Sequence, residues 1–127
     1  MNGDSAMLSV DDLRFVNLVA TRTFGSGEPP AEPSGLDAAL AAVPTGPPHE
    51  RAAGLAGALL SRRVFSVAPL TTAFLAMSCQ LELGGMQLLA PQGATVGMLR
   101  ELAGGVVDVG TVARWLEDRA VPTSSEG

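Results

Sequence analysis

The sequence has few of the side chains that usually do chemistry, with one cysteine and one histidine in 127 residues. A single cysteine cannot form an internal disulfide, and Cys79 lies within an apolar segment, so we interpret it as a small buried residue in a reducing compartment. The only histidine, His49, has neither a second histidine nor a cysteine pair to complete a zinc site. We therefore expect no metal, no cofactor and a cytoplasmic location.

Lysine and long apolar runs are also missing. The eight cations are all arginine, scattered along a chain of net charge −5, whereas a nucleic-acid interface needs a clustered basic patch. The N-terminus lacks a basic region followed by an apolar run, so we expect no signal peptide. The most apolar segment, 69–83, is shorter than the ~20 residues that span a bilayer. We expect neither nucleic acid nor a membrane as partner.

The chain is expected to fold around the segment RVFSVAPLTTAFLAMSCQLELGG. After a short loop this segment predicts a helix over 69–83, because proline suits the first helical position and the Gly84-Gly85 pair favours a left-handed stop. Nearly every face of this helix is apolar, which is typical of a buried helix. The sequence thus predicts an all-α domain around a buried central helix, about 69–83.

Five further segments show apolar residues at helical spacing. A residue suited to capping precedes three of these helices: Ser9, Ser34 and Asp108. The stretch 25–34, rich in glycine and proline, is typical of a loop. Together the segments predict a single domain over 1–120, a bundle of about six helices, and a disordered tail at 121–127. The remaining expected elements are helices at 10–21, 34–43, 49–62, 94–103 and from 109, and a strand-like or irregular segment at 86–90.

In order and spacing, these segments resemble the Fic/Doc (death-on-curing) family over about residues 8–118. The family's first helix resembles MLSVDDL, and an early helix of the Doc type resembles SGLDAALAAV. Its active-site helix–loop–helix resembles AGLAGALLSRRVFSVAPLTTAFLAMSCQLELGG, and its closing pair of helices resembles RELAGGVVDVGTVARWLED. The resemblance implies a Fic/Doc-like helical bundle whose active loop would precede the helix at 69–83.

The active loop of that family has the pattern His-x-Phe-x-Asp-Gly/Ala-Asn-Lys-Arg-Thr-Ala. The corresponding positions of this chain are RVFSVAPLTTA, residues 63–73. The positions that match are those that pack: Phe65, Ala68, Thr72 and Ala73. The positions that do chemistry in the family are all replaced: Arg63, Val67, Pro69, Leu70 and Thr71.

Each replacement removes a function that the family's reaction needs. The family's histidine takes a proton from the target hydroxyl, whereas an arginine such as Arg63 stays protonated near neutrality. The acidic position organises a metal on phosphate, and Val67 has no oxygen to bind one. Pro69 lacks a backbone N–H at the helix start, and Leu70 and Thr71 carry no charge, so the phosphate clamp is lost.

We therefore expect a Fic/Doc-like pseudoenzyme that acts by binding another protein, in a regulatory or toxin–antitoxin-like role. The sole histidine does not replace the missing base, since helix geometry places His49 some 20 Å from the loop. Doc proteins are held by an antitoxin whose tail folds into an apolar groove. The resemblance thus implies an antitoxin-like partner, or the product of a neighbouring gene, in a heteromer; a homodimer is also open.

Two other functions remain open from the sequence. Arg62, Arg63, Thr71 and Thr72 lie near the start of the central helix, where residual anion contacts would suit a divergent nucleotide-dependent phospho- or nucleotidyl-transferase. A small helical structural or adaptor subunit of a larger assembly would instead show an apolar patch larger than the ~300–600 Å² normal for monomers.

Overall fold

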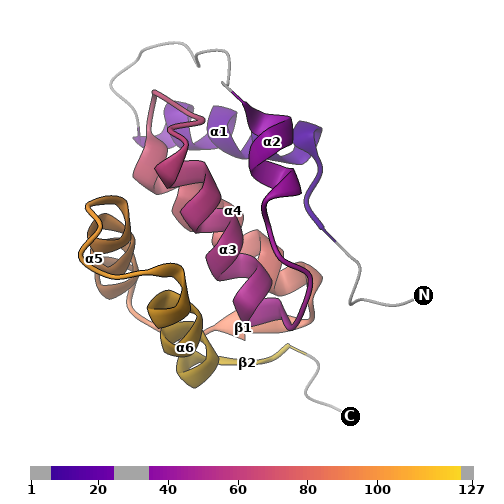
Figure 1. Ribbon diagram of the computed structural model, residues 1–127, viewed down its shortest axis with the longest axis vertical. Coiled ribbons are helices and arrows are strands. Elements are labelled where there is room, and N and C mark those ends of the chain that lie inside the picture. The colour runs from indigo at the N-terminus through magenta and orange to yellow at the C-terminus, as the bar shows by residue number, and fades with distance from the viewer. Residues whose placement is uncertain (1–6, 25–34, 124–127) are drawn as a thin grey trace.

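The computed structural model describes residues 7–24 and 35–123, and within these ranges the chain is mostly helical (Figure 1). In these ranges the elements follow in the order α1 Val10–Phe24, α2 Leu36–Ala41, α3 Pro48–Ser61, α4 Pro69–Leu83, β1 Met86–Leu88, α5 Gln92–Ala103, α6 Val109–Arg119 and β2 Ala120–Pro122. The all-α class is confirmed for the described chain, as are the bounds expected for α4. The expected loop at 25–34 lies outside the described residues.

Two of the expected caps start their helices. Ser9 Oγ accepts a hydrogen bond from the backbone N–H of Asp12 at 3.1 Å, and Asp12 Oδ2 accepts one from the N–H of Ser9 at 2.9 Å. This reciprocal pair satisfies two of the free N–H groups at the start of α1. At α6, Asp108 Oδ1 accepts from the backbone N–H and from the hydroxyl of Thr111, each at 2.8 Å. These bonds hold the pKa of Asp108 below its usual range.

Helix α2 is shorter than the expected 34–43. It begins at Leu36 after Gly35, whose φ of 69° is a left-handed conformation that glycine adopts freely. The expected cap, Ser34, lies outside the described residues. The helix ends at Ala41, because the approach of Pro44 disfavours helical backbone in the residue before it.

Helix α3 shares the centre of the fold with α4. Residues 51–59 of α3 are all buried, whereas α4 leaves Glu82 and Leu83 exposed. Small residues on α3 let its neighbours approach closely, and a Cβ added at Gly57 would lie 2.5 Å from Val109 of α6. The expectation of α4 as a single central helix is thus corrected to a central pair.

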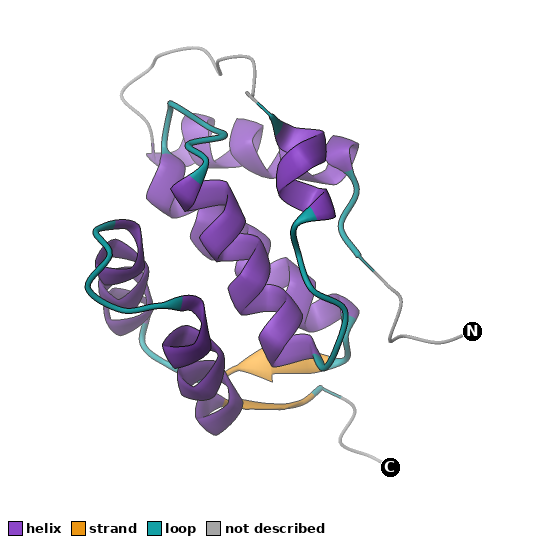
Figure 2. Ribbon diagram, viewed as in Figure 1, coloured by secondary structure: helices purple, strands orange, loops and turns teal. Residues whose placement is uncertain are grey.

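The remaining helices lie on two sides of this pair. In Figure 2, α1 and α2 lie at one end of the view and α5 and α6 at the other, with α3 and α4 running between them. One core cluster joins α1 and α2 to α3 and α4, and a second joins α5 and α6 to the same pair. The α3–α4 loop belongs to the first cluster through the buried side chains of Val64 and Phe65.

A two-stranded antiparallel sheet closes one end of the molecule. β1 pairs with β2 in the register Met86↔Pro122, Gln87↔Val121 and Leu88↔Ala120. The strand-like reading of the segment after α4 is confirmed, but Val121 and Pro122 lie in β2 instead of the expected tail. Backbone bonds on either side extend the pairing, from Leu89 N to Arg119 O at 2.7 Å and from Thr123 N to Gly85 O at 2.8 Å.

Helix α4 is mostly apolar and is 15 residues long. Among the described helices, none has both the length and the apolar character that crossing a membrane requires. Two polar side chains of α4, Thr72 and Gln80, are buried, and both hydrogen-bond to the segment that contains α1.

Candidate functional site

The loop between α3 and α4, which resembles the family's active loop, begins and ends with non-glycine residues in left-handed conformations. At its start Arg63 has a φ of 52°, and at its end Ala68 has a φ of 53°. The N–H of Arg63 donates to Leu60 O at 3.2 Å and that of Val64 to Leu59 O at 3.1 Å, which closes the end of α3. A side chain in this conformation costs roughly 1–2 kcal/mol, so packing elsewhere must hold the loop.

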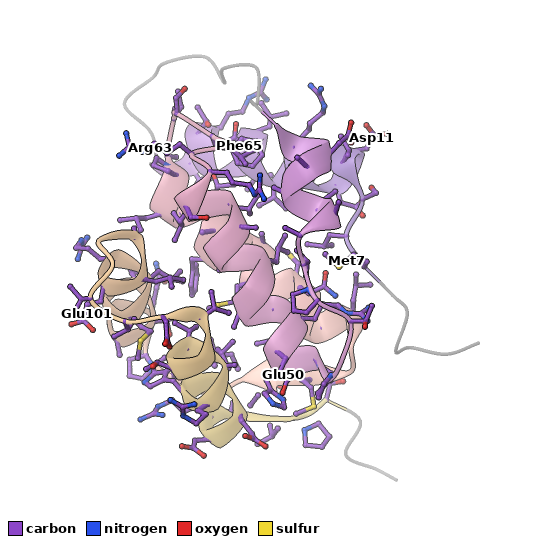
Figure 3. The ribbon with its side chains drawn as sticks, in the orientation of Figure 1. Met7, Asp11, Glu50, Arg63, Phe65 and Glu101 are labelled. Carbon is purple, nitrogen blue, oxygen red and sulfur yellow. The ribbon has the colours of Figure 1, made fainter. Side chains whose placement is uncertain are left out.

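Buried side chains hold this loop against the first core cluster. Val64 and Phe65 pack into the cluster formed with α1 and α2, while Arg63 and Ser66 are exposed. Figure 3 shows Phe65 among the helices and Arg63 near the edge of the molecule. The loop is thus anchored by apolar groups and presents polar ones to solvent.

A buried asparagine ties the same loop to α1. The side-chain amide of Asn17 donates to Val67 O at 3.0 Å and to Thr72 Oγ1 at 2.9 Å. Asn17 is 3% exposed and Thr72 is 0% exposed, so these bonds are shielded from water. Thr21 Oγ1 in turn donates to Asn17 O at 2.7 Å. Sequence reasoning missed this link; the available signal was an asparagine on the otherwise apolar face of α1.

The residues expected to offer residual anion contacts differ in their exposure to solvent. Arg62 and Arg63 are exposed at the end of α3, and Thr71 is half-buried. Thr72 is fully buried and its hydroxyl already accepts the amide of Asn17. Thr72 thus belongs to the core, whereas the two guanidinium groups lie at exposed positions.

The other replaced positions serve the backbone and the core. Pro69 is the first residue of α4, Val67 supplies a carbonyl to Asn17, and Leu70 packs against the second core cluster. Across residues 7–24 and 35–123, no three His, Cys, Asp or Glu side chains gather closely enough to hold a metal ion.

The sole histidine lies at the far end of α3 from the loop. His49 is near the start of that helix, and its Nε2 is 3.9 Å from Oε1 of Glu117 on α6. Figure 3 shows the neighbouring Glu50 and Arg63 at opposite ends of the helix. A cavity of about 310 Å³ opens here, lined by Pro44, His49, Glu50, Val109, Gly110, Ala113, Arg114 and Glu117.

A groove of about 360 Å³ lies between α1 and α4, and it could not be located from the sequence. Its edges carry large apolar side chains in water, with Phe15 64% exposed and Leu83 43% exposed. Val19, one turn along α1 from Phe15, is also exposed. The groove is lined by Leu8, Asp12, Phe15, Val16, Cys79, Glu82 and Leu83. We call this surface the α1–α4 groove.

Polar contacts at two levels fix the helices that form the α1–α4 groove. The backbone N–H of Leu8 donates to Gln80 Oε1 at 3.1 Å near the C-terminal end of α4. The Asn17–Thr72 bond joins the same helices near the N-terminal end of α4. The two helices therefore run antiparallel, and both contacts are buried.

The thiol of Cys79 lies in the wall of the groove. Burial raises its pKa above the ordinary value of 9.0, and the carboxylates of Glu82 and Asp12 raise it further. The thiol therefore stays neutral near pH 7 and contributes apolar surface.

A third hollow, of about 720 Å³, lies where the α2–α3 connection meets the residues before α1. It is lined by Met7, Leu40, Val43, Pro44, Thr45, Gly46, Pro47 and Arg51. None of these three hollows includes a residue of the loop that resembles the family's active site.

Comparison of the chain with models of protein families, with curated proteins and with solved structures found no match.

Proposed function

We propose that this chain is a catalytically inactive Fic/Doc-like protein that acts by binding another protein. The contrast between two sets of positions in the α3–α4 loop supports this proposal. The matching positions Phe65, Thr72 and Ala73 are buried and hold the loop in place. The replaced positions supply neither a base nor a metal ligand.

The observation that carries the proposal is the exposed apolar edge of the α1–α4 groove. Burying a large apolar side chain is worth about 1.5–3 kcal/mol, and both Phe15 and Leu83 leave much of their surface in water. A groove between two helices with apolar edges suits the apolar face of a third helix. By the resemblance to Doc proteins, the partner is an antitoxin-like protein or a neighbouring-gene product.

Co-expression with the products of the adjacent reading frames tests the proposal. We expect one of them to co-purify with the wild-type chain, and Phe15→Asp to reduce that co-purification at least about ten-fold, because it places a charge where an apolar contact is required. Val106→Asp is the matched control, since Val106 is 73% exposed and lies between α5 and α6, away from the groove. Equal effects of the two substitutions, or no partner among these products, would overturn the proposal.

A further inference from the structure

The α1–α4 groove also carries information about the charge of its occupant. This inference rests on the proposed function, because it concerns the partner of the same surface. The groove is small: its volume of about 360 Å³ lies at the lower end of the ~300–1,000 Å³ of small-molecule sites. Its lining includes the exposed apolar side chains of Phe15 and Leu83, one from each helix. Exposed apolar side chains on two neighbouring helices suit the apolar stripe of a third helix.

Two carboxylates line the groove beside this apolar surface. Asp12 comes from α1 and Glu82 from α4, so they approach the groove from opposite walls. Both carboxylates also raise the pKa of the Cys79 thiol, which lies in the same groove. Within the described ranges 7–24 and 35–123, the residues that line the groove include no arginine.

A second copy of this chain is a poor occupant on the same grounds. A two-fold contact through the groove would bring the Asp12 and Glu82 carboxylates of one copy against those of the other. Like charges facing each other across an interface oppose association. A partner with cations beside its apolar stripe would instead pair with both carboxylates.

We propose that the α1–α4 groove binds an amphipathic helix of another protein that carries arginine or lysine on each side of its apolar stripe. The apolar residues of this helix lie between Phe15 and Leu83. The cations reach Asp12 on one wall and Glu82 on the other. The apolar contacts provide most of the affinity, while the charges select the partner and its orientation.

Two synthetic helical peptides with the same leucine stripe provide the probe, one flanked by arginine and the other by glutamate. Binding of each labelled peptide to the full chain is measured by fluorescence anisotropy at low and at physiological salt. We expect the arginine peptide to bind more tightly, and Glu82→Arg to weaken it about five-fold, as expected for loss of a rim ion pair. The preference should diminish as salt screens the charges.

Glu101→Arg is the matched control, because it makes the same change in net charge at an exposed position on α5 (Figure 3). We expect it to change binding by less than about two-fold, since its site is remote from the groove. Equal weakening by Glu82→Arg and Glu101→Arg would show a general net-charge effect and overturn the inference. Equal binding of the two peptides, or binding of neither, would also overturn it.

Phe15→Ser separates failure of this inference from failure of the proposed function. If Phe15→Ser weakens both peptides while charge makes no difference, the groove is a docking surface without the proposed charge preference. If Phe15→Ser leaves binding of the arginine peptide unchanged, the groove is not the docking surface, and both proposals fail. Circular dichroism of each variant checks that the helices remain intact.

Discussion

The α3–α4 loop and the α1–α4 groove share the helix α4 but differ in what their side chains are doing. In and next to the loop, Phe65 and Thr72 are buried, and their contacts are made within the chain. In the groove, large apolar side chains such as Phe15 and Leu83 remain in water. The apolar side chains that anchor the loop are buried by the chain itself, whereas those of the groove are left exposed to solvent.

This difference is the reason why we propose the groove, and not the loop, as the binding surface. A pattern of residues indicates where a related protein would act, but the loop here has its hydroxyl engaged and its backbone fixed. Exposed apolar area that the chain itself leaves uncovered indicates where something else is needed. The following predictions test the contrast, beginning with the largest effect.

Removing the amide that holds the loop should cause the largest loss. Asn17→Ala leaves the Val67 carbonyl and the Thr72 hydroxyl without their buried donor, and we expect the free energy of unfolding to fall by about 2–3 kcal/mol. Urea unfolding, followed by circular dichroism, measures this change in the free energy of unfolding. Thr23→Ala, at an exposed position of the same helix, should change stability by less than about 0.5 kcal/mol. Similar losses for both variants would show that the amide does not anchor the loop.

Relieving the left-handed backbone strain at Arg63 should have a smaller effect on stability, and one of opposite sign. Arg63→Gly should stabilise the fold by about 1 kcal/mol, because φ is 52° at this position and glycine adopts that conformation freely. Arg62→Gly is the control: its φ of −91° gives glycine no advantage, so we expect destabilisation by about 0.5–1 kcal/mol.

The same variant tests the alternative transferase function. If Arg63 bound a nucleotide, Arg63→Gly would abolish binding of ATP and magnesium in calorimetry. We expect instead that no binding tighter than about 100 μM occurs in either protein. Tight binding that is lost in the variant would make the loop, and not the groove, the functional surface.

The smallest effect concerns the thiol in the groove. The raised pKa of Cys79 means that the fraction of thiolate, and with it the rate of alkylation by iodoacetamide, should rise only as pH approaches and passes 9.0. Glu82→Gln removes one cause of that raised pKa, so the rise should begin at lower pH. An unchanged profile would show that the Glu82 carboxylate does not raise the pKa of Cys79. Bound partner should protect Cys79 from alkylation.

The sequence predicted those parts of the fold that local signals define. Pro69 and the Gly84-Gly85 pair bound α4 where expected, and Ser9 and Asp108 cap their helices as predicted. These features depend on residues within a few positions of each other. The strand at Ala120–Pro122 was missed, because three residues are too few to show an alternating pattern and the pairing partner is more than thirty residues away.

What depends on distant contacts was not predictable. The central role of α3 follows from how closely α6 approaches Gly57, and the role of Asn17 follows from meeting Val67 across the fold. The groove depends on which faces of α1 and α4 remain uncovered after every other helix has packed. The sequence showed Phe15 as an apolar residue, but not that it would remain in water.

The buried contacts at Gln80 and Thr72 have a consequence for kinetics. Buried hydrogen bonds at Gln80 and at Thr72 hold α4 against the segment that contains α1. The width of the α1–α4 groove is therefore fixed before a partner binds. Binding at the groove would then require little rearrangement of this chain. The association rate would be set by diffusional encounter and by the ordering of the partner segment. Differences in dissociation rate among bound segments would accordingly depend on how well each segment fills a groove of fixed width.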